Sequence, residues 1–263
     1  MLNCCGNPKH FSVNSLLHEP LIDAFDTDYS VPFSKKLVCI VGCCDCLICL
    51  AVGQKDLFLL NPSTRICKKL SDFGEDINFG CFSYVLGFGK TSDDYKVVGF
   101  SNFSEIIVKV YSLKSDQWKR IEDFKGSRLM DDPAIAIFAD GKLHGIAISE
   151  LESESGWEIF SLDLETEEYG ILPMPNYVLS VFWPRLGTYD GCLYVLCNHP
   201  IGADVWIIDD NGVGKETWTK VVTIPYIFDD FSIHIYKKVL YVLKNGEVLL
   251  LCGLKLVIFD AKD

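Results

Sequence analysis

A repeat of about fifty residues runs through this 263-residue chain and constrains its fold more than any other feature. One set of segments begins at residues 44, 94, 141, 191 and 237, and these starts are separated by 50, 47, 50 and 46 residues. Each segment is a turn followed by a short run that is typical of a β-strand, as in Asp94–Phe100 and Gly191–Cys197. The chain is therefore expected to consist of similar β-units placed one after another.

A second set of segments follows the first four, and each copy ends on a large residue or a cysteine. The copies are Leu57–Cys67, Val108–Trp118, Ile159–Tyr169 and the looser Val205–Trp218. Their final positions, Cys67, Trp118, Tyr169 and Trp218, lie 51, 51 and 49 residues apart. In each copy a short polar side chain suited to a tight turn ends the first strand, and these are Asn61, Ser112, Asp163 and Asp209. We predict that the returning strand places its final repeat residue against the neighbouring sheet.

Two well-marked strands with a period near fifty are typical of kelch repeats, which form the blades of β-propellers. No blade can bury both of its own faces, so stacking of blades is what forms the core. Helical patterns are scarce. The sequence therefore predicts an all-β, kelch-like β-propeller of roughly five to seven four-stranded blades. A fifth copy starts at Leu256–Asp260, where the sequence stops. Either the last blade is incomplete or an N-terminal strand closes the ring, with Phe11–Leu17 as the candidate.

Charge and hydropathy exclude two classes of partner. The chain has 36 acidic and 24 basic residues, a net charge of −12, and a field of that sign repels phosphate backbones. The N-terminus lacks the basic and apolar pattern of a signal peptide. The longest apolar stretch, Leu37–Ala51, is interrupted by Asp45 and too short to cross a bilayer, so we predict a pair of interior strands there. We expect neither nucleic acid nor membrane as a partner.

Five of the twelve cysteines fall between residues 39 and 49. Zinc sites of the finger and ribbon type need two separated ligand pairs, and no second pair follows at a suitable spacing. Alternate residues of a strand also face opposite ways, so these sulfurs would not converge. We predict no metal site and instead reduced thiols in a cytoplasmic or nuclear protein.

The residues that catalysis requires do not form a recognisable pattern. None of the five histidines belongs to a metal-ligand pair, and Gly87-Phe-Gly89 lacks the third glycine of a phosphate loop. His144 is predicted to be a hydrogen-bonded core residue, and the acidic run Glu150–Glu158 a solvated loop. We therefore predict no catalytic residue, no cofactor and no enzyme. The alternative is a propeller hydrolase or oxidase, which would place two carboxylates or a histidine cluster at the mouth of its channel.

Several ordered motifs resemble one known family. They are Gly42–Leu50 (GCCDCLICL), Asp56–Arg65 (DLFLLNPSTR), Leu86–Gly89 with Asp93–Val98 (DDYKVV), Val108–Leu113, Glu216–Lys220 and Lys244–Leu250 (KNGEVLL). Together they are similar to the plant F-box proteins with an F-box-associated interaction domain, which include the S-locus F-box and kelch-repeat types. The likeness extends from about Phe11 to Asp260. One departure is Cys46, because the family commonly has glycine there. If this position needs a positive φ, a cysteine would cost roughly 1 kcal/mol of strain.

The resemblance implies a propeller that binds a protein substrate for a cullin-type (SCF) ubiquitin ligase. In the family an F-box docks on the ligase adaptor. Residues 1–10 are too few for this three-helix element, so we expect the chain to lack it and residues 11–263 to form the propeller. Such a chain would bind its target without docking on the adaptor and cullin. It would be a truncated product, a splice form or a member that lost the F-box, and a non-functional truncated paralogue is the further alternative.

The predicted binding surface consists of the loops at one face of the blades. Loops between second and third strands share that face with loops between successive blades, and several carry aromatic or acidic residues. Acidic loops indicate a partner that presents Lys or Arg. The candidate partner-binding residues are Phe73, Phe79, Phe103, Glu152, Glu154, Tyr177, His199 and Phe228.

Overall fold

The computed structural model describes β-strands and turns in most of the chain. The described residues are 4–5, 9–10, 25–26, 37–53, 56–73, 81–102, 106–124, 127–129, 136–149, 156–176, 182–189, 191–209, 217–225, 228–229, 232–233, 236–242, 247–252 and 255–260. Within these ranges no helix is long and apolar enough to span a bilayer. The chain divides into two compact units, residues 1–86 with 94–121 and residues 87–93 with 122–263.

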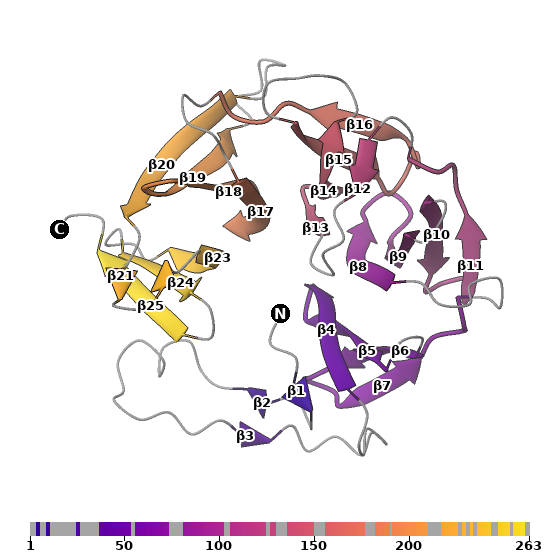
Figure 1. Ribbon diagram of the computed structural model, residues 1–263. Helices are drawn as coiled ribbons and strands as arrows, with labels where there is room; N and C mark the ends of the chain where they lie inside the picture. Colours follow the sequence, from indigo (N-terminus) through magenta and orange to yellow (C-terminus); the bar gives the residue numbers. More distant parts are fainter. Residues whose placement is uncertain are drawn as a thin grey trace. The chain divides into compact units, whose positions relative to one another are not determined.

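Unit 1 contains two antiparallel sheets of at least four strands (Figure 1). The first sheet has the order β1-β4-β5-β6-β7. Its strands are β1 (Cys4–Cys5), β4 (Leu37–Cys44), β5 (Leu47–Val52), β6 (Asp56–Asn61) and β7 (Ile66–Lys69). The second sheet is formed by β8 (Cys81–Gly89), β9 (Asp94–Asn102), β10 (Ile106–Ser112) and β11 (Gln117–Arg120), although the end of β8 belongs to unit 2. A small ladder pairs β2 (Lys9–His10) with β3 (Phe25–Asp26).

Unit 2 contains the third, fourth and fifth sheets. In the third sheet β12 (Ser127–Leu129) and β13 (Ala136–Ala139) share one edge of β14 (Lys142–Ser149), which is followed by β15 (Trp157–Asp163) and β16 (Tyr169–Leu172). The fourth sheet is β17 (Phe182–Tyr189), β18 (Cys192–His199), β19 (Gly202–Asp209) and β20 (Thr217–Pro225). The fifth comprises β23 (Tyr236–Val242), β24 (Glu247–Cys252) and β25 (Lys255–Asp260), and β21 (Phe228–Asp229) pairs with β22 (Ser232–Ile233).

The predicted all-β class and repeated four-stranded unit are confirmed. The first repeat set corresponds to β5, β9, β14, β18 and β23, and the second set corresponds to the third and fourth strands of each of the first four sheets. The apolar stretch Leu37–Ala51 is the predicted strand pair, β4 and β5. In the described residues the fifth sheet has three strands. The proposed closing strand at Phe11–Leu17 lies outside the described residues.

The turn between the third and fourth strands has the same conformation in three sheets. The Asn61 Oδ1 atom accepts hydrogen bonds from the backbone N–H groups of Ser63 and Thr64, at 3.0 and 3.1 Å. Asp163 Oδ1 does the same for Glu165 and Thr166, at 2.8 and 3.2 Å, and Ser112 Oγ accepts one such bond. The last turn residue then has a positive φ, with values of 59° at Arg65, 57° at Asp116 and 59° at Glu167. The short polar residue predicted to start each turn thus supplies its first hydrogen bonds.

The loop of the β4–β5 hairpin consists of two residues with positive φ. Asp45 and Cys46 have φ values of 45° and 65°, and Cys44 pairs with Leu47 on either side of them. The β13–β14 hairpin uses Asp140 and Gly141 in the same way, with φ values of 48° and 76°. This is the type I′ geometry that suits the twist of a hairpin, and glycine is favoured at its second position. The strain expected of a cysteine at this position depended on a positive φ, and the φ of Cys46 is positive.

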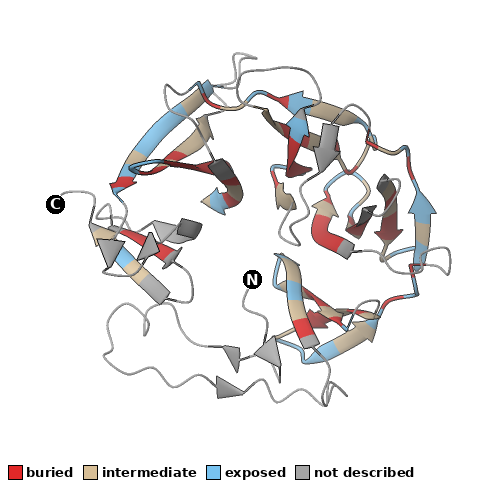
Figure 2. Ribbon diagram, in the orientation of Figure 1, coloured by how far each residue is buried: buried red, intermediate tan, exposed pale blue. Residues whose placement is uncertain are grey.

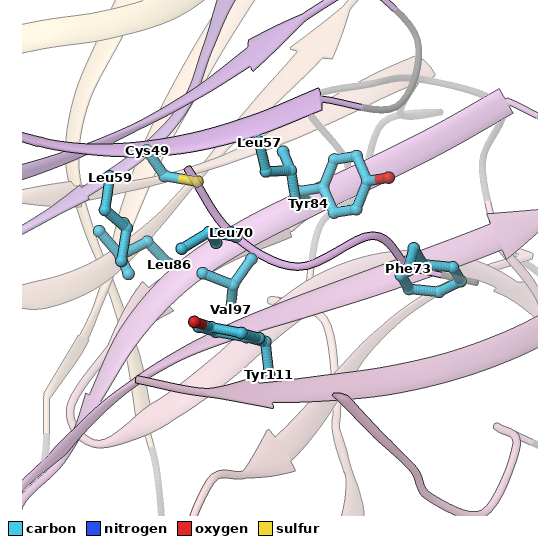
Figure 3. Packing of buried hydrophobic residues seen from close by; sticks show 9 residues of the cluster. All are labelled: Cys49, Leu57, Leu59, Leu70, Phe73, Tyr84, Leu86, Val97 and Tyr111. Atoms are coloured by element: carbon cyan, nitrogen blue, oxygen red, sulfur yellow. The ribbon is translucent and has the colours of Figure 1, made fainter. Parts of the chain in front are cut away.

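The hydrophobic core lies between successive sheets of each unit. Figure 2 shows that the buried positions concentrate on middle strands such as β18, whereas the fourth strands β11 and β20 are largely exposed. In unit 1 the core joins Cys49 and Leu57 of the first sheet to Tyr84 and Tyr111 of the second (Figure 3). Leu70 and Phe73, from the linker after β7, complete this cluster. The linker after β7 therefore belongs to the core of unit 1.

Candidate interaction surface

Trp118 ties the second sheet to the linker that follows the first. Its indole N–H donates a hydrogen bond to the backbone carbonyl of Ser71 at 2.8 Å, and its ring packs edge-on against Phe73 with centroids 4.9 Å apart. The Lys109 ammonium donates to the Phe73 carbonyl at 2.7 Å and lies 4.8 Å from the centre of the Phe73 ring. The carbonyl groups of a linker have no backbone donor from a neighbouring strand. The Trp118 and Lys109 side chains supply the hydrogen-bond donors instead.

The same contact recurs twice in unit 2. The Tyr169 hydroxyl donates to the carbonyl of Glu122, and the Trp218 indole N–H donates to the carbonyl of Pro173, both at 2.8 Å. Tyr169 also packs against Phe124, with ring centroids 5.5 Å apart. The equivalent position in the first repeat is Cys67, and its side chain is too short for such a contact. It packs with Val38, Leu50 and Leu60 on its own sheet, and burial raises the pKa of its thiol.

The prediction that Phe73 is an uncovered, partner-binding aromatic is wrong about its exposure. The side chain is only 6% exposed, because the rings of Tyr84 and Trp118 pack edge-on against its ring. The repeat read from the sequence ends with the fourth strand, so it gives no role to a residue of the linker that follows. The sequence does carry the signal, since Phe73 and Phe124 lie 51 residues apart and each follows a buried aliphatic residue, Leu70 or Ile121, by three positions.

Glu165 forms a further link inside unit 2. Its Oε1 atom accepts hydrogen bonds from the backbone N–H groups of Thr91 and Ser92, at 2.8 and 3.1 Å, and from the Ser92 hydroxyl at 3.3 Å. A Cβ atom at Gly89 would lie 2.5 Å from the Ser92 hydroxyl oxygen and 2.7 Å from this carboxylate, so a larger residue there would displace these side chains. The carboxylate therefore fixes the β8–β9 turn to the β15–β16 turn.

At the opposite end of unit 2, two aliphatic side chains face solvent beside the connections between second and third strands. Ile201 lies in the β18–β19 turn and is 70% exposed, and Ile148 near the end of β14 is 39% exposed. Both connections lie where the outer strand of a sheet ends, because neighbouring strands are antiparallel. The third and fourth sheets pack on each other through a cluster that includes Ile146, Ile159 and Trp218. The described residues at this end, Ile148 and the β18–β19 turn, are called the loop end of unit 2 below.

A polar cluster surrounds His199, which lies two residues before Ile201. His199 is 3% exposed, and its Nε2 atom lies 3.6 Å from Oδ1 of Asp204. The Thr223 hydroxyl donates to the same carboxylate at 2.6 Å, and the Lys220 ammonium lies 3.6 Å from its other oxygen. His199 was predicted to contact a partner from a loop face, and its burial corrects that expectation. It forms part of the base of the turn, while Ile201 is the residue that faces solvent.

The other predicted partner-binding residues lie outside the described residues or in a strand of which only the backbone is described. Phe79, Phe103, Glu152, Glu154 and Tyr177 lie outside the described residues, and for Phe228 only the backbone, in β21, is described. In the part of the chain that the structure describes, no group of three or more His, Cys, Asp or Glu side chains is arranged to hold a metal ion. Cys43 and Cys46 are exposed at the β4–β5 hairpin, whereas Cys49 is buried in the core.

His144 lies in β14 and is buried, with 9% of its surface exposed. Burial disfavours the charged imidazolium and lowers the pKa of His144 to about 4. The ring is therefore neutral at physiological pH. A neutral, enclosed ring fits the predicted core role of this residue.

Four successive antiparallel sheets, three of them tied by an aromatic side chain to the linker before it, are the blades of a β-propeller. The comparisons with known proteins specify the class. The chain matches the F-box associated beta propeller domain over residues 1–256 and belongs to this family.

The relatives are F-box proteins of Arabidopsis thaliana. The F-box protein CPR1 is 31% identical over 258 residues, a match covering 85% of this chain and 61% of the relative. An F-box/kelch-repeat protein is 31% identical over 199 residues, covering 72% of this chain and 54% of the relative. The chain thus spans little more than half the length of these curated relatives. Among solved structures, YjhT aligns over 84% of this chain and 72% of its own, with a TM-score of 0.48 and 12% identity.

Proposed function

We propose that this chain is a protein-recognition domain that captures a protein substrate, as the substrate-binding part of an SCF-type ubiquitin ligase does. The observation that supports this proposal most strongly is the family match over residues 1–256. It is joined by relatives that are named as F-box proteins at 31% identity. The proposal includes a non-catalytic role and a cytoplasmic or nuclear location.

The geometry of the described residues supports binding rather than chemistry. Ile201 projects from a two-residue turn at the loop end of unit 2, and a fixed aliphatic side chain can serve as an anchor for a partner. His144, which is buried in β14, has a pKa lowered by burial to about 4, which suits a structural residue better than a general base near pH 7. The charge of −12 favours a partner with basic residues.

The test is affinity purification with mass spectrometry on two forms of the chain. One form is the chain alone, and the other carries an F-box from a relative fused to its N-terminus. We expect both forms to capture the same protein, and the fused form to bring the ligase adaptor and to promote ubiquitin transfer to that protein. Excess untagged chain should displace the captured protein.

Two outcomes would contradict the proposal. One is that neither form captures a protein that the untagged chain displaces. The other is turnover of a small-molecule substrate by the purified chain, which would favour the enzyme alternative.

A further inference from the structure

We propose that the outer edge of β20 is a docking surface, and that it binds an extended segment of the substrate as an additional strand of the fourth sheet. The segment it takes is an uncharged strand rich in β-branched residues. This inference rests on the proposed function and assigns it a place and a mode of recognition.

β20 is longer than the outer strands of the preceding sheets. It has nine residues, whereas β7, β11 and β16, which occupy the same place in the first three sheets, have four each. Six of its nine residues are exposed (Figure 2), and in the described residues no further strand pairs with its outer edge. A long strand edge presents a row of backbone N–H and C=O groups with which another strand can pair.

Two of the shorter outer strands carry a protection that β20 lacks. β7 contains Lys68 and Lys69, and β11 contains Lys119 and Arg120. Charged side chains on an edge strand hinder the approach of another strand. β20 has a single charged residue, Lys220, in more than twice the length.

The charge of Lys220 is directed over the face of its own sheet. The ammonium lies 3.6 Å from the Asp204 carboxylate and 5.8 Å from the centre of the Trp206 ring. Asp204 and Trp206 belong to β19, the inner neighbour of β20, so the lysine side chain reaches back across the sheet. Residues 217–225 therefore leave their outer edge open to a partner strand.

A β-bulge places an apolar side chain on this edge. Lys220 pairs with Trp206 and Val222 pairs with Val205, so Val221 has no counterpart on β19. Val221 is 48% exposed. A bulge re-aims the side chain of its extra residue, and here it makes a valine available for contact with a partner strand.

The residues along the edge indicate which strand it takes. Thr217, Thr219 and Thr223 are exposed like Val221, and all four are β-branched and uncharged. Such side chains pack well against β-branched or aromatic residues of a paired strand. Pro225, which lacks a backbone N–H, ends the edge. The partner is a different protein rather than a second copy, because two chains that each carry a net charge of −12 repel one another.

The experiment is a selection from a phage library that displays random twelve-residue peptides, with the full chain as bait. We expect the recovered peptides to be enriched in Val, Ile and Thr. A synthetic copy should bind the double variant Thr219→Lys, Val221→Lys about tenfold more weakly, because two lysines give β20 the protection that β7 and β11 have. The matched control is Ile66→Lys with Ile171→Lys, which adds the same charge at exposed isoleucines of β7 and β16 and should bind like the unmodified chain.

N-methylated peptides test the backbone pairing without altering the chain. The N–H groups of a strand point alternately to its two sides, so methylating every second amide blocks one side and leaves the other free. One of the two methylated series should lose binding, and the other should retain it. Hydrogen exchange should show that amides of β20 gain protection when the unmethylated peptide binds. These measurements do not depend on the folding of the double lysine variant.

The inference fails if no peptide is enriched, if both methylated series bind equally well, or if the double lysine variant, shown to be folded by thermal melting, binds as tightly as the unmodified chain. A dimer in light scattering that the double lysine variant abolishes would overturn the assignment of the edge to a different protein. If the folded variant still captures the protein found by affinity purification, the proposed function stands and the docking surface lies elsewhere. If no protein is captured by any form of the chain, the proposed function itself fails.

Discussion

The indole N–H of Trp118 donates a hydrogen bond to the backbone carbonyl of Ser71, 2.8 Å away and 47 residues earlier in the chain. Tyr169 and Glu122 are also 47 residues apart, and Trp218 and Pro173 are 45 apart. One aromatic side chain therefore satisfies one linker carbonyl at each of these three junctions, while its ring packs among buried side chains. The junctions combine apolar burial with a directional bond that fixes the position of the linker.

Trp118→Phe tests the directional part of this contact. The phenylalanine keeps most of the packing but leaves the Ser71 carbonyl without its donor, so we expect a loss of about 1 kcal/mol in the free energy of unfolding. Trp118→Ala removes the packing as well and should cost about 3 kcal/mol or more. Urea unfolding measures both, with the exposed neighbour Gln117→Ala as the control. Equal stability of Trp118→Phe and the unmodified chain would show that the hydrogen bond contributes nothing.

Cys46→Gly should stabilise the protein by about 1 kcal/mol. Cys46 has a φ of 65°, a conformation that L side chains adopt at a cost and glycine adopts freely. Gly141→Ala is the reverse test, because Gly141 has a φ of 76° and an added Cβ would meet no atom within 4 Å. It should destabilise by a similar amount. Denaturant midpoints that move in the same direction for both variants would contradict the backbone explanation.

Glu165→Ala should destabilise unit 2 by about 1–3 kcal/mol, since it leaves the backbone N–H groups of Thr91 and Ser92 without their acceptor. Glu165→Gln keeps one acceptor oxygen and should lose less. Hydrogen exchange of the Thr91 and Ser92 amides reports the change locally. Glu168→Gln, in the same turn but exposed, should leave that exchange unchanged.

Acid should destabilise the protein through His144. Its folded-state pKa is about 4 and its ordinary value is 6.5, so the unfolded chain binds a proton more readily. The stability that neutral His144 contributes is fully present above pH 6.5 and is lost as the pH falls towards 4. At pH 4.5 the free energy of unfolding should have fallen by about 2–3 kcal/mol on this account. His144→Gln should remove that part of the pH dependence. Unfolding free energies of both chains at pH 7 and 4.5 provide the comparison, and identical differences between the two pH values would exclude His144 as the cause.

The sequence by itself determined the repeating unit. The starts of the strands, the turn residues Asn61, Ser112 and Asp163, and the repeat aromatics Trp118, Tyr169 and Trp218 could all be read from local patterns. This is possible because turn chemistry and strand alternation act between residues close in the chain. The positive φ at Cys46 could be anticipated for the same reason, since a two-residue hairpin defines its own backbone geometry.

Only the tertiary structure decided which side chains of the loops are covered. Phe73 and His199 occupy loop or strand-end positions in the sequence, yet both are buried, while Ile201, two residues after His199, faces solvent. Glu165 accepts hydrogen bonds from Thr91 and Ser92, which lie 74 and 73 positions earlier in the chain. Burial of this kind depends on which linker lies against which sheet, and that arrangement is set by the sum of many weak contacts between distant segments rather than by any local pattern.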